Sequence, residues 1–521
     1  MDGMGERVKT VVEFGARDLT IQDVWLLAER QAVPRLGEEA RARVGKSAAH
    51  VEAALARDGV IYGVTTGYGE SCTTEVPPDL VAELPLHLTR FHGCGLGRFL
   101  TPEETRAVLA VRLAALVRGW SGVSVDLAQL LCDMLDRDIL PLIPAEGSVG
   151  ASGDLTPLSY IAGALAGERD VIFEGRRLRA DAAFAEAGLK PIKLRPKEAL
   201  AVMNGTAVMA GLAAIAFMRA EGLARLATRM TAMASIGLLG NPRHFDVRLS
   251  HAKPHPGQGR VAHRIAADLA LFEKKHAPTR VQDRYSIRCT PHVIGVWEDT
   301  SETLRTLIET EINSANDNPL FDPETGDVLH GGHFYGGHIA FAMDSLKQLV
   351  ANIADLMDRQ FALLVDVKFN NGLPANLSGA TGPRAAINHG LKALQIGVSA
   401  WTAEALKNTM PASVFSRSTE CHNQDKVSMG TIAARDALRN LELAEQVAAG
   451  HLVACSQALR LRERAGEITQ DMLGAGALAL RERVPFVNED APLDSLLSEL
   501  VHAIARQQLV ADWSGEAESA R

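Results

Sequence analysis

The sequence predicts a mainly α-helical protein built on a bundle of long helices, with a smaller mixed part at the N-terminus. Of the 521 residues, 47% are hydrophobic and 22% are charged, which is the composition of a folded globular protein. After about residue 196, apolar residues recur at helical spacing over stretches much longer than an average helix. Helices that are apolar on more than one side usually pack into a bundle. The stretches are 197–239, 298–315, 336–364, 390–408 and 428–457.

Short strands and helices alternate near the N-terminus, so we expect one domain over residues 1–200 and the helical bundle over 201–521. Residues 8–14 are typical of a strand, and Thr20 is placed to cap a helix with Asp23 in its first turn. Three further elements are expected: a helix over 38–57, a strand passing into a mobile loop over 59–70, and a hairpin over 170–178 around Glu174 and Gly175.

Charge and cysteine patterns exclude several classes of protein. The net charge is −9 and no basic stripe occurs, so we expect no nucleic-acid partner. The six cysteines are scattered without a Cys-x-x-Cys pair, which is typical of reduced thiols in a cytosol. The N-terminus lacks a signal-peptide pattern, and the longest apolar run, 205–218, is too short to span a bilayer. We therefore expect a cytoplasmic protein without a membrane partner.

Two further patterns do not form the sites that they suggest. Three histidines between His330 and His338 have the spacing H-x2-H-x4-H, which is irregular for a helix face and lacks a completing cysteine or carboxylate. We expect a hydrogen-bonding loop there and no metal site. The glycine-rich segment 91–97 is followed by Arg98 where a dinucleotide-binding fingerprint needs its last glycine.

The segment Gly147–Ser159 has two interpretations. At its centre lie Ala151, Ser152 and Gly153, three residues with very small side chains. The first interpretation is a flexible loop before a helix, capped by Ser152 or Asp154. In the second, the amide nitrogen of Gly153 attacks the carbonyl carbon of Ala151, and loss of water yields an electrophilic methylidene-imidazolone. Only residues with almost no side chain permit so close an approach. The segment alone favours the first interpretation.

Other polar residues also have ordinary explanations when each is taken alone. Tyr62 fits a half-buried aromatic residue at a strand end. Tyr285 and Arg288 fit an ordinary surface loop with an ion pair. Asn204, Gln282 and Asn423 fit capping or turn residues. Ser152 is not expected to be a hydrolase nucleophile, because its surroundings lack the second glycine of a nucleophile elbow.

Six blocks taken together resemble the aromatic amino acid ammonia-lyase family, which includes histidine, phenylalanine and tyrosine ammonia-lyases and related aminomutases. The blocks occur in the family's order, and the Ala-Ser-Gly-Asp motif with its flanks is highly specific. They are Tyr62–Gly69, Gly147–Leu158, Asn204–Thr206, Val281–Arg288, Asn313–Pro319 and His422–Asp425. The resemblance implies the long-helix bundle of the fumarase/aspartase-like superfamily. Fumarase-type lyases themselves are disfavoured because their Met-Pro-x-Lys sequence is absent.

The resemblance also implies a mechanism. Ala151, Ser152 and Gly153 are expected to cyclise autocatalytically into the methylidene-imidazolone group (MIO), so that no external cofactor is needed. Tyr62 corresponds to the base that removes the β-proton, and Tyr285 to a second tyrosine that assists it. Arg288 corresponds to the residue that pairs with the substrate carboxylate. The family assembles each active site from three subunits of a homotetramer. A catalytically inactive helical scaffold is the competing hypothesis.

Substrate choice is expected to depend on the residues around the ring of the substrate. Phe91 and His92 occupy the family's selectivity pair, where His92 suits a phenol hydroxyl. Gln424 corresponds to a position with glutamate in histidine enzymes and glutamine in phenylalanine and tyrosine enzymes. We therefore expect L-tyrosine, giving trans-4-hydroxycinnamate (p-coumarate), with L-histidine, giving urocanate, as runner-up. L-phenylalanine and an aminomutase remain open. The other expected binding residues are Asn204, Gln282, Phe334, Glu420 and Asn423.

Overall fold

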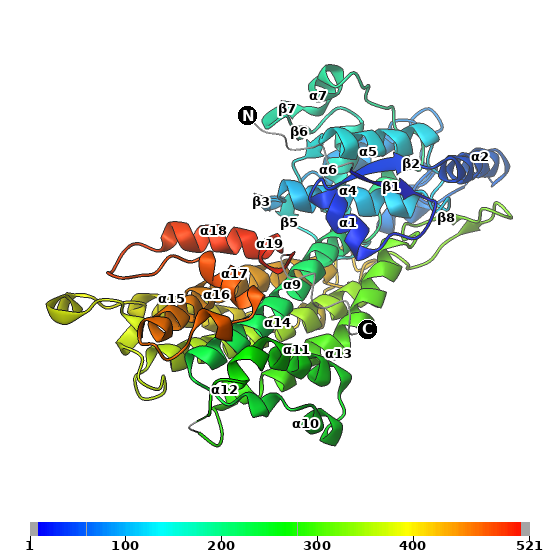
Figure 1. Ribbon diagram of the computed structural model, residues 1–521. Helices are drawn as coiled ribbons and strands as arrows, with labels where there is room; N and C mark the ends of the chain where they lie inside the picture. The colour runs from blue at the N-terminus through cyan, green and yellow to red at the C-terminus, as the bar shows by residue number, and fades with distance from the viewer. Residues whose placement is uncertain (1–8, 59, 279, 512–521) are drawn as a thin grey trace. The chain divides into compact units, whose positions relative to one another are not determined.

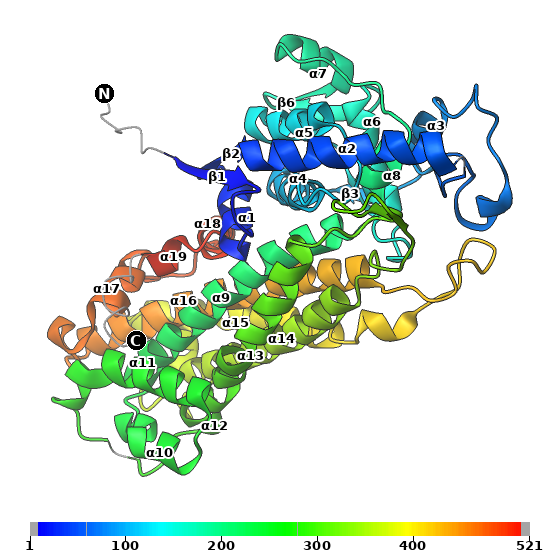
Figure 2. The same ribbon diagram turned by 90° about the vertical axis from the view of Figure 1, so that its right-hand side faces the viewer.

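The computed structural model describes residues 9–58, 60–278 and 280–511, and most of its elements are helices (Figures 1 and 2). The predicted mainly helical fold is confirmed. The chain forms two compact units, each assembled from three stretches. Unit 1 comprises Met1–Met218, Arg305–Asp344 and Pro411–Arg435, and unit 2 comprises Arg219–Leu304, Ser345–Met410 and Asp436–Arg521. The domain boundary predicted after residue 200 stays a prediction.

The described residues of unit 1 form four small sheets. The first pairs β1 (Thr10–Phe14) in parallel with β2 (Ala32–Leu36), joined by α1 (Ile21–Ala28). The predicted hairpin is confirmed as β6 and β7, whose turn residues Glu174 and Gly175 both have positive φ angles. The remaining strands are β3 (Leu96–Phe99) with β5 (Pro144–Glu146), β4 (Leu140–Pro141) beside β6 (Asp170–Phe173) and β7 (Arg176–Arg179), and β8 (Leu320–Phe321) with β9 (Val328–Leu329).

Where unit 1 is described, seven further helices pack with an apolar core. In α4 (Pro102–Leu116), residues 104–116 are all buried, and Thr101 caps the N-terminus through a capping box with Glu104. The predicted helix over 38–57 is confirmed as α2. The other helices are α2 (Glu38–Asp58), α3 (Leu84–Phe91), α5 (Val125–Arg137), α6 (Leu155–Leu165), α7 (Ala180–Glu186) and α8 (Glu198–Met203).

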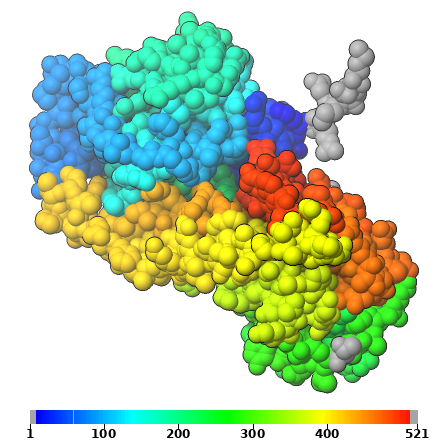
Figure 3. Space-filling model, turned by 90° about the vertical axis from the view of Figure 1, so that its left-hand side faces the viewer, coloured from blue at the N-terminus to red at the C-terminus, as the bar shows by residue number. Residues whose placement is uncertain are grey.

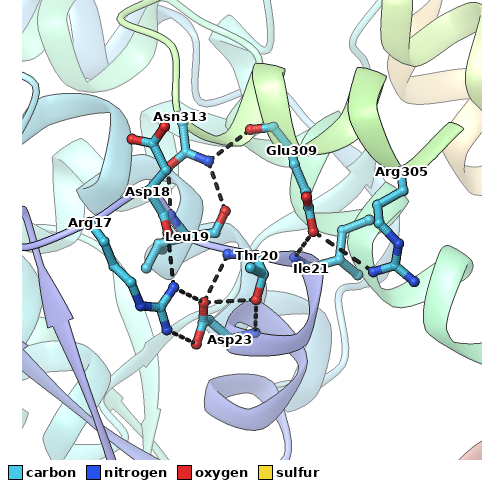
Figure 4. Close-up of polar contacts among 9 residues, drawn as sticks. All are labelled: Arg17, Asp18, Leu19, Thr20, Ile21, Asp23, Arg305, Glu309 and Asn313. Carbon is cyan, nitrogen blue, oxygen red and sulfur yellow. Dashed lines mark hydrogen bonds and ion pairs between the residues drawn. The ribbon is translucent and has the colours of Figure 1, made fainter. Parts of the chain in front are cut away.

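Side chains at the C-terminal end of α13 (Thr290–Ile312) form hydrogen bonds with the backbone at the start of α1 (Figure 4). Thr20 caps α1 with Asp23 in a capping box, as predicted. The Asn313 side chain accepts from the Leu19 amide at 2.8 Å and donates to the Leu19 carbonyl at 2.8 Å. Glu309 accepts from the Ile21 amide at 2.9 Å. These contacts satisfy backbone groups at the start of α1 that have no partner inside the helix.

The strand predicted within 59–70 is wrong. Residue 59 lies outside the described residues, and the following chain forms a turn and the short 3-10 helix η1 (Gly69–Thr73). The Ile61 carbonyl accepts from the amides of Val64 and Thr65, while the Thr65 hydroxyl accepts from the Ile61 amide. Gly63 has a φ of +64°. The β-branched residues suggested a strand, but local hydrogen bonds favour a turn.

The long helices run side by side in both ribbon views, and unit 2 contains the larger part of each of them (Figures 1 and 2). The predicted helix over 197–239 is interrupted at 204–206, so that α8 ends at Met203 and α9 begins at Ala207. The yellow α15 lies on the surface (Figure 3), where Ile396 and Leu406 are exposed. The long helices are α9 (Ala207–Gly237), α11 (Pro256–Glu273), α13, α14 (Gly337–Val365), α15 (Lys392–Lys407) and α16 (Gly430–Arg464).

One of the long helices has the length of a membrane span. The helix α9 is 31 residues long and apolar enough to cross a bilayer, but 89% of its most apolar window is buried inside the protein. It is therefore a core helix, as predicted for the apolar run within it. The short elements in the described part of unit 2 are η2 (Pro242–Phe245), α10 (Val247–Ala252), α12 (Tyr285–Arg288), η3 (Ala375–Leu377), η4 (Gly382–Ile387), η6 (Gln470–Met472), α17 (Ala475–Glu482), α18 (Asp494–Ala505) and α19 (Gln508–Ala511).

A buried polar cluster joins four helices inside unit 2. The side-chain amide of Gln360 on α14 donates to Thr231 on α9 at 2.9 Å and to Thr290 on α13 at 3.1 Å. Its oxygen pairs with Nε2 of His451 on α16 at 2.9 Å, so Nε2 carries the proton. Burial lowers the pKa of His451 to about 3, and the imidazole is neutral in the folded protein.

His451 makes the stability of the protein sensitive to acid. Its pKa is lower in the folded state than the ordinary value of 6.5, so the unfolded chain binds more protons below pH 6.5. The contribution of His451 to the free energy of unfolding is fully present above pH 6.5 and is lost as the pH falls toward about 3. Between pH 7 and pH 5 we expect this group to cost about 2 kcal/mol.

The measurement compares urea unfolding midpoints at pH 7 and pH 5 for the wild type and His451→Gln, which keeps an N–H donor but cannot titrate. We expect a smaller pH dependence in the variant. His263→Gln, at an exposed histidine of α11, is the matched control and should behave like the wild type. Equal pH dependence in all three proteins would contradict the assignment.

Candidate active site

The Ala151–Gly153 tripeptide is held against a second backbone segment of unit 1. The Asp154 amide donates to the Gly205 carbonyl at 2.7 Å, and the Gly205 amide donates to the Ser152 carbonyl at 3.3 Å. Gly153 has a φ of +69°, and a Cβ added there would overlap the carbonyl group of Gly205. Position 153 therefore requires glycine both for its backbone angle and for this close approach.

Two of the predicted binding residues contact Ser152 directly. Nδ2 of Asn204 donates to the Ser152 carbonyl at 2.6 Å, and Nε2 of Gln424 donates to Oγ of Ser152 at 3.1 Å. The Asn204 side-chain oxygen accepts from the Asn318 amide at 2.6 Å, which fixes the orientation of the Asn204 amide. Asp154 is the N-cap of α6 by position, but its side chain makes no capping hydrogen bond.

The Asp154 carboxylate instead contacts buried groups next to the tripeptide. Its carboxylate accepts from the Met209 amide at 2.9 Å and pairs with the hydroxyls of Ser148 and Thr431. Burial raises the pKa of Asp154 to about 6, against the opposing effect of these hydrogen bonds. The first interpretation of the segment, a flexible capped loop, does not describe this arrangement, because the loop is fastened on several sides.

Tyr62 lies in a loop that contacts a second loop of unit 1. Its hydroxyl accepts from the Gly69 amide at 2.9 Å, and the Glu420 carboxylate accepts from the Glu70 amide at 3.0 Å. Burial raises the pKa of Tyr62, and the nearby charges of Glu420 and Cys72 raise it further. This direction is opposite to the one that a base working near neutral pH needs, so the surroundings of Tyr62 within unit 1 keep it neutral.

One tight turn presents both Glu420 and Gln424. A backbone bridge joins Thr419 to Gln424, and the Asn423 amide donates to the Glu420 carbonyl at 2.9 Å. Glu420 and the two residues after it have positive φ angles, although none is glycine. Such strained backbone is concentrated at functional sites. The Asn423 side chain is exposed, and its predicted substrate contact stays a prediction.

The selectivity pair lies at the C-terminal end of α3. The rings of Phe91 and His92 are 4.2 Å apart between centroids, and Phe91 is 60% exposed. Nδ1 of His92 donates to the Leu88 carbonyl at 3.1 Å. Burial lowers the pKa of His92, so the ring is neutral and Nε2 is a hydrogen-bond acceptor. This nitrogen suits an O–H or an N–H of a substrate.

Three predicted residues lie in unit 2 and are grouped around α12. The Arg288 guanidinium lies 4.7 Å from the centre of the Tyr285 ring, and its Nε is buried without a hydrogen-bond partner. Gln282 and Tyr285 line a cavity of about 760 Å³. A buried, unsatisfied guanidinium nitrogen is suited to a carboxylate ligand. The predicted meeting of these residues with Ser152 stays a prediction.

Two residues of unit 1 were missed as parts of the site, and one prediction has no direct contact. The His330 ring lies edge-on to Tyr62 with centroids 6.4 Å apart, whereas the sequence suggested only a hydrogen-bonding loop. Arg112 is fully buried and donates to the Asn204 carbonyl at 3.0 Å. A single arginine within the apolar run of α4 was the available signal. Phe334 is half-buried between β9 and α14, and its predicted packing beside the ring stays a prediction.

The described residues contain no group of three histidine, cysteine or acidic side chains that could hold a metal ion.

Comparisons with known proteins identify the family. The family model described as aromatic amino acid lyase matches residues 19–481. Histidine ammonia-lyase of Koribacter versatilis is 37% identical over 487 residues, covering 91% of this chain and 93% of the relative. That of Gloeobacter violaceus is 37% identical and covers 94% and 95%. The structure of tyrosine aminomutase from Streptomyces globisporus superposes with a TM-score of 0.88 at 32% identity, covering 96% and 98%. The chain belongs to the aromatic amino acid lyase family and is a carbon-nitrogen lyase.

Proposed function

We propose that the protein eliminates ammonia from L-histidine to give urocanate. The observation that carries this proposal is the name of its relatives, because the histidine ammonia-lyases at 37% identity match at least 91% of the chain. Nε2 of His92 supports it, since a neutral acceptor nitrogen can pair with the N–H of a substrate imidazole. The preference for L-tyrosine expected from the sequence is not confirmed.

L-tyrosine remains the second candidate because of Gln424. An amide occupies this position, so no carboxylate is available there to pair with a substrate imidazole. The amide is oriented by two contacts, with its oxygen near Thr419 at 3.1 Å and its nitrogen near Ser152 at 3.1 Å. His92 suits a phenol O–H as well as an imidazole N–H. L-phenylalanine and aminomutase activity follow as further alternatives, the latter favoured by the likeness to tyrosine aminomutase.

Autocatalytic conversion of Ala151, Ser152 and Gly153 into MIO is part of the proposal. The backbone leaves room for the group, because Gly153 has a φ of +69° and lies where an added Cβ would overlap Gly205. The Ser152 carbonyl accepts from Asn204 and from the Gly205 amide, and these donors stabilise negative charge on that oxygen. Gln424 donates to the Ser152 hydroxyl, the oxygen that leaves as water. When formed, the group supplies an electrophilic methylidene carbon.

The remaining side chains act on the substrate. Arg288 binds the substrate carboxylate, and Tyr62 removes the β-proton with assistance from Tyr285. Gln282, Phe334, Glu420 and Asn423 line the pocket in the roles that the resemblance implies. Because burial and nearby negative charge raise the pKa of Tyr62, its action as a base requires a positive charge at the hydroxyl. The substrate ammonium and Arg288 are the cations that this arrangement offers.

A homotetramer with active sites shared between subunits completes the proposal. Its support is the set of exposed apolar side chains on α15, such as Ile396 and Leu406. We also propose a cytoplasmic location, which agrees with six free cysteines and with a buried α9.

The substrate is decided by assaying the purified protein with L-histidine, L-tyrosine and L-phenylalanine in parallel. We expect urocanate from L-histidine with a kcat/KM at least tenfold above that for L-tyrosine. Release of p-coumarate at the higher kcat/KM would replace the first candidate by the second. Recovery of a β-amino acid in the chiral product assay would indicate an aminomutase. Ser152→Ala is the inactive control.

Gly153→Ala tests formation of the prosthetic group. The added Cβ would overlap the Gly205 carbonyl, so we expect loss of the near-ultraviolet absorbance of the group and at least a thousandfold fall in kcat. The matched control is Gly175→Ala, whose φ of +74° is also positive but whose added Cβ meets nothing within 4 Å. The control should keep both absorbance and activity. Normal absorbance in Gly153→Ala would contradict the assignment of the tripeptide.

Gln424→Glu tests the role of this position in selectivity. A carboxylate attracts an imidazole N–H more strongly than an amide does, so we expect the ratio of kcat/KM for L-histidine over L-tyrosine to rise about tenfold, corresponding to about 1.4 kcal/mol. The ratio is measured by initial rates of urocanate and p-coumarate release. An unchanged ratio would remove Gln424 from the residues that select the substrate.

A further inference from the structure

A turn between α9 and α10 is hydrogen-bonded to the loop that precedes Arg288. The Asn241 amide donates to the Asp283 carboxylate at 2.7 Å, and its side chain donates to the Val281 carbonyl at 3.4 Å. In return, the Asp283 amide donates to Nε2 of His244 at 2.9 Å. All of these residues belong to unit 2. The turn therefore holds both the side chain and the backbone of Asp283.

The other side of the same segment is held by the buried polar cluster. Gln360 donates to the Ser286 carbonyl at 2.9 Å, and the Thr290 hydroxyl donates to the same carbonyl at 3.0 Å. The segment Gln282–Arg288 is thus anchored at Ser286 by the helical core and at Asp283 by the turn. The core anchors consist of amide and hydroxyl groups that do not titrate near neutral pH. The anchors at the turn include two titratable side chains, the His244 imidazole and the Asp283 carboxylate.

The contact assigns a protonation state to His244. An amide N–H can donate only to an unprotonated ring nitrogen, so Nε2 is the acceptor and Nδ1 carries the proton. Burial lowers the pKa of His244 below 6.5, the charge of Asp283 raises it, and that of Arg288 lowers it. The charged groups that act on His244 are thus the Asp283 carboxylate, whose Oδ2 is 3.5 Å from Nε2, and the Arg288 guanidinium.

We propose that neutral His244 is a positioning residue that holds the Gln282–Arg288 segment so that Arg288 is directed at the substrate carboxylate. Protonation of Nε2 replaces an acceptor by a donor, which removes the partner of the Asp283 amide and draws the imidazolium toward the Asp283 carboxylate. That carboxylate is then divided between His244 and the Asn241 amide. The role assigned to Arg288 rests on the proposed function, whereas the contact between the turn and the loop does not.

Two variants of His244 separate the hydrogen bond from the titration. His244→Gln supplies a side-chain oxygen that accepts from the Asp283 amide at every pH. His244→Phe keeps a ring of similar size but removes the acceptor. His263→Phe, on the exposed side of α11 in the same unit, is the matched control.

The first measurement is hydrogen exchange of the peptide that covers residues 281–288 in the full-length protein at pH 7.5. We expect wild type, His244→Gln and His263→Phe to exchange at the same rate and His244→Phe at least tenfold faster. Unchanged exchange in His244→Phe, with its fold retained by circular dichroism, would overturn the proposal.

The second measurement is the pH dependence of KM for whichever substrate the parallel assay identifies. We expect His244→Phe to raise KM about tenfold at pH 7.5 with kcat changed less than threefold. In the wild type KM should rise as the pH falls from 6.5 to 5, and in His244→Gln this rise should be absent. The same acid rise in His244→Gln would overturn the titration of His244 as its cause. Faster exchange in His244→Phe with unchanged KM would support the positioning of the loop and contradict the role of Arg288.

Discussion

The backbone contact between Gly153 and Gly205 is the constraint on which the rest of unit 1 depends. Each of the two helices that define the site, α6 and α9, begins two residues after one of these glycines. Because neither residue has a side chain, the two backbone segments approach closely enough to form hydrogen bonds with each other. The contact bends the tripeptide, and the same segment places the Asn204 side chain on the Ser152 carbonyl. The position of the Asn204 side chain on the Ser152 carbonyl and the start of the 31-residue helix α9 thus depend on one contact.

Buried charged side chains lie next to this contact, and one of them forms a hydrogen bond with its backbone. Arg112 donates to the Asn204 carbonyl and to the Asn316 side chain, and Lys197 forms an ion pair with Asp317 in which both side chains are fully buried. Burial lowers the pKa of both Arg112 and Lys197, and the charge of Asp317 opposes this effect. Removing one member of such a cluster leaves an uncompensated charge, which costs several kcal/mol. The cluster therefore fixes the position of the backbone next to the tripeptide more than it contributes to the stability of the fold.

The fold was more predictable from the sequence than the site was. Periodicity located α2, α13, α14, α15 and α16, because long amphipathic helices carry a repeated signal. It failed at 59–70, where threonine hydroxyls and glycine favour a turn, and at 204–206, where the break serves the contact with Gly153. Asn204, Gln424 and Tyr62 were found through motif resemblance. Arg112 and His244 were not, because burial and the hydrogen bond to Asp283 arise only when distant segments meet.

The electrostatic surroundings of Tyr62 and of Arg288, each within its own unit, bear on the roles proposed for them. The surroundings of Tyr62 in unit 1 are apolar or negative, and they raise its pKa through burial and the charge of Glu420. Unit 2 carries the opposite property, a guanidinium at Arg288 whose Nε is buried without a partner. Under the proposed function, an amino acid zwitterion compensates both properties. We propose that its carboxylate pairs with the Arg288 guanidinium and that its ammonium lowers the pKa of Tyr62. In that proposal the base is generated mainly when substrate is bound, so that proton removal is confined to the occupied site.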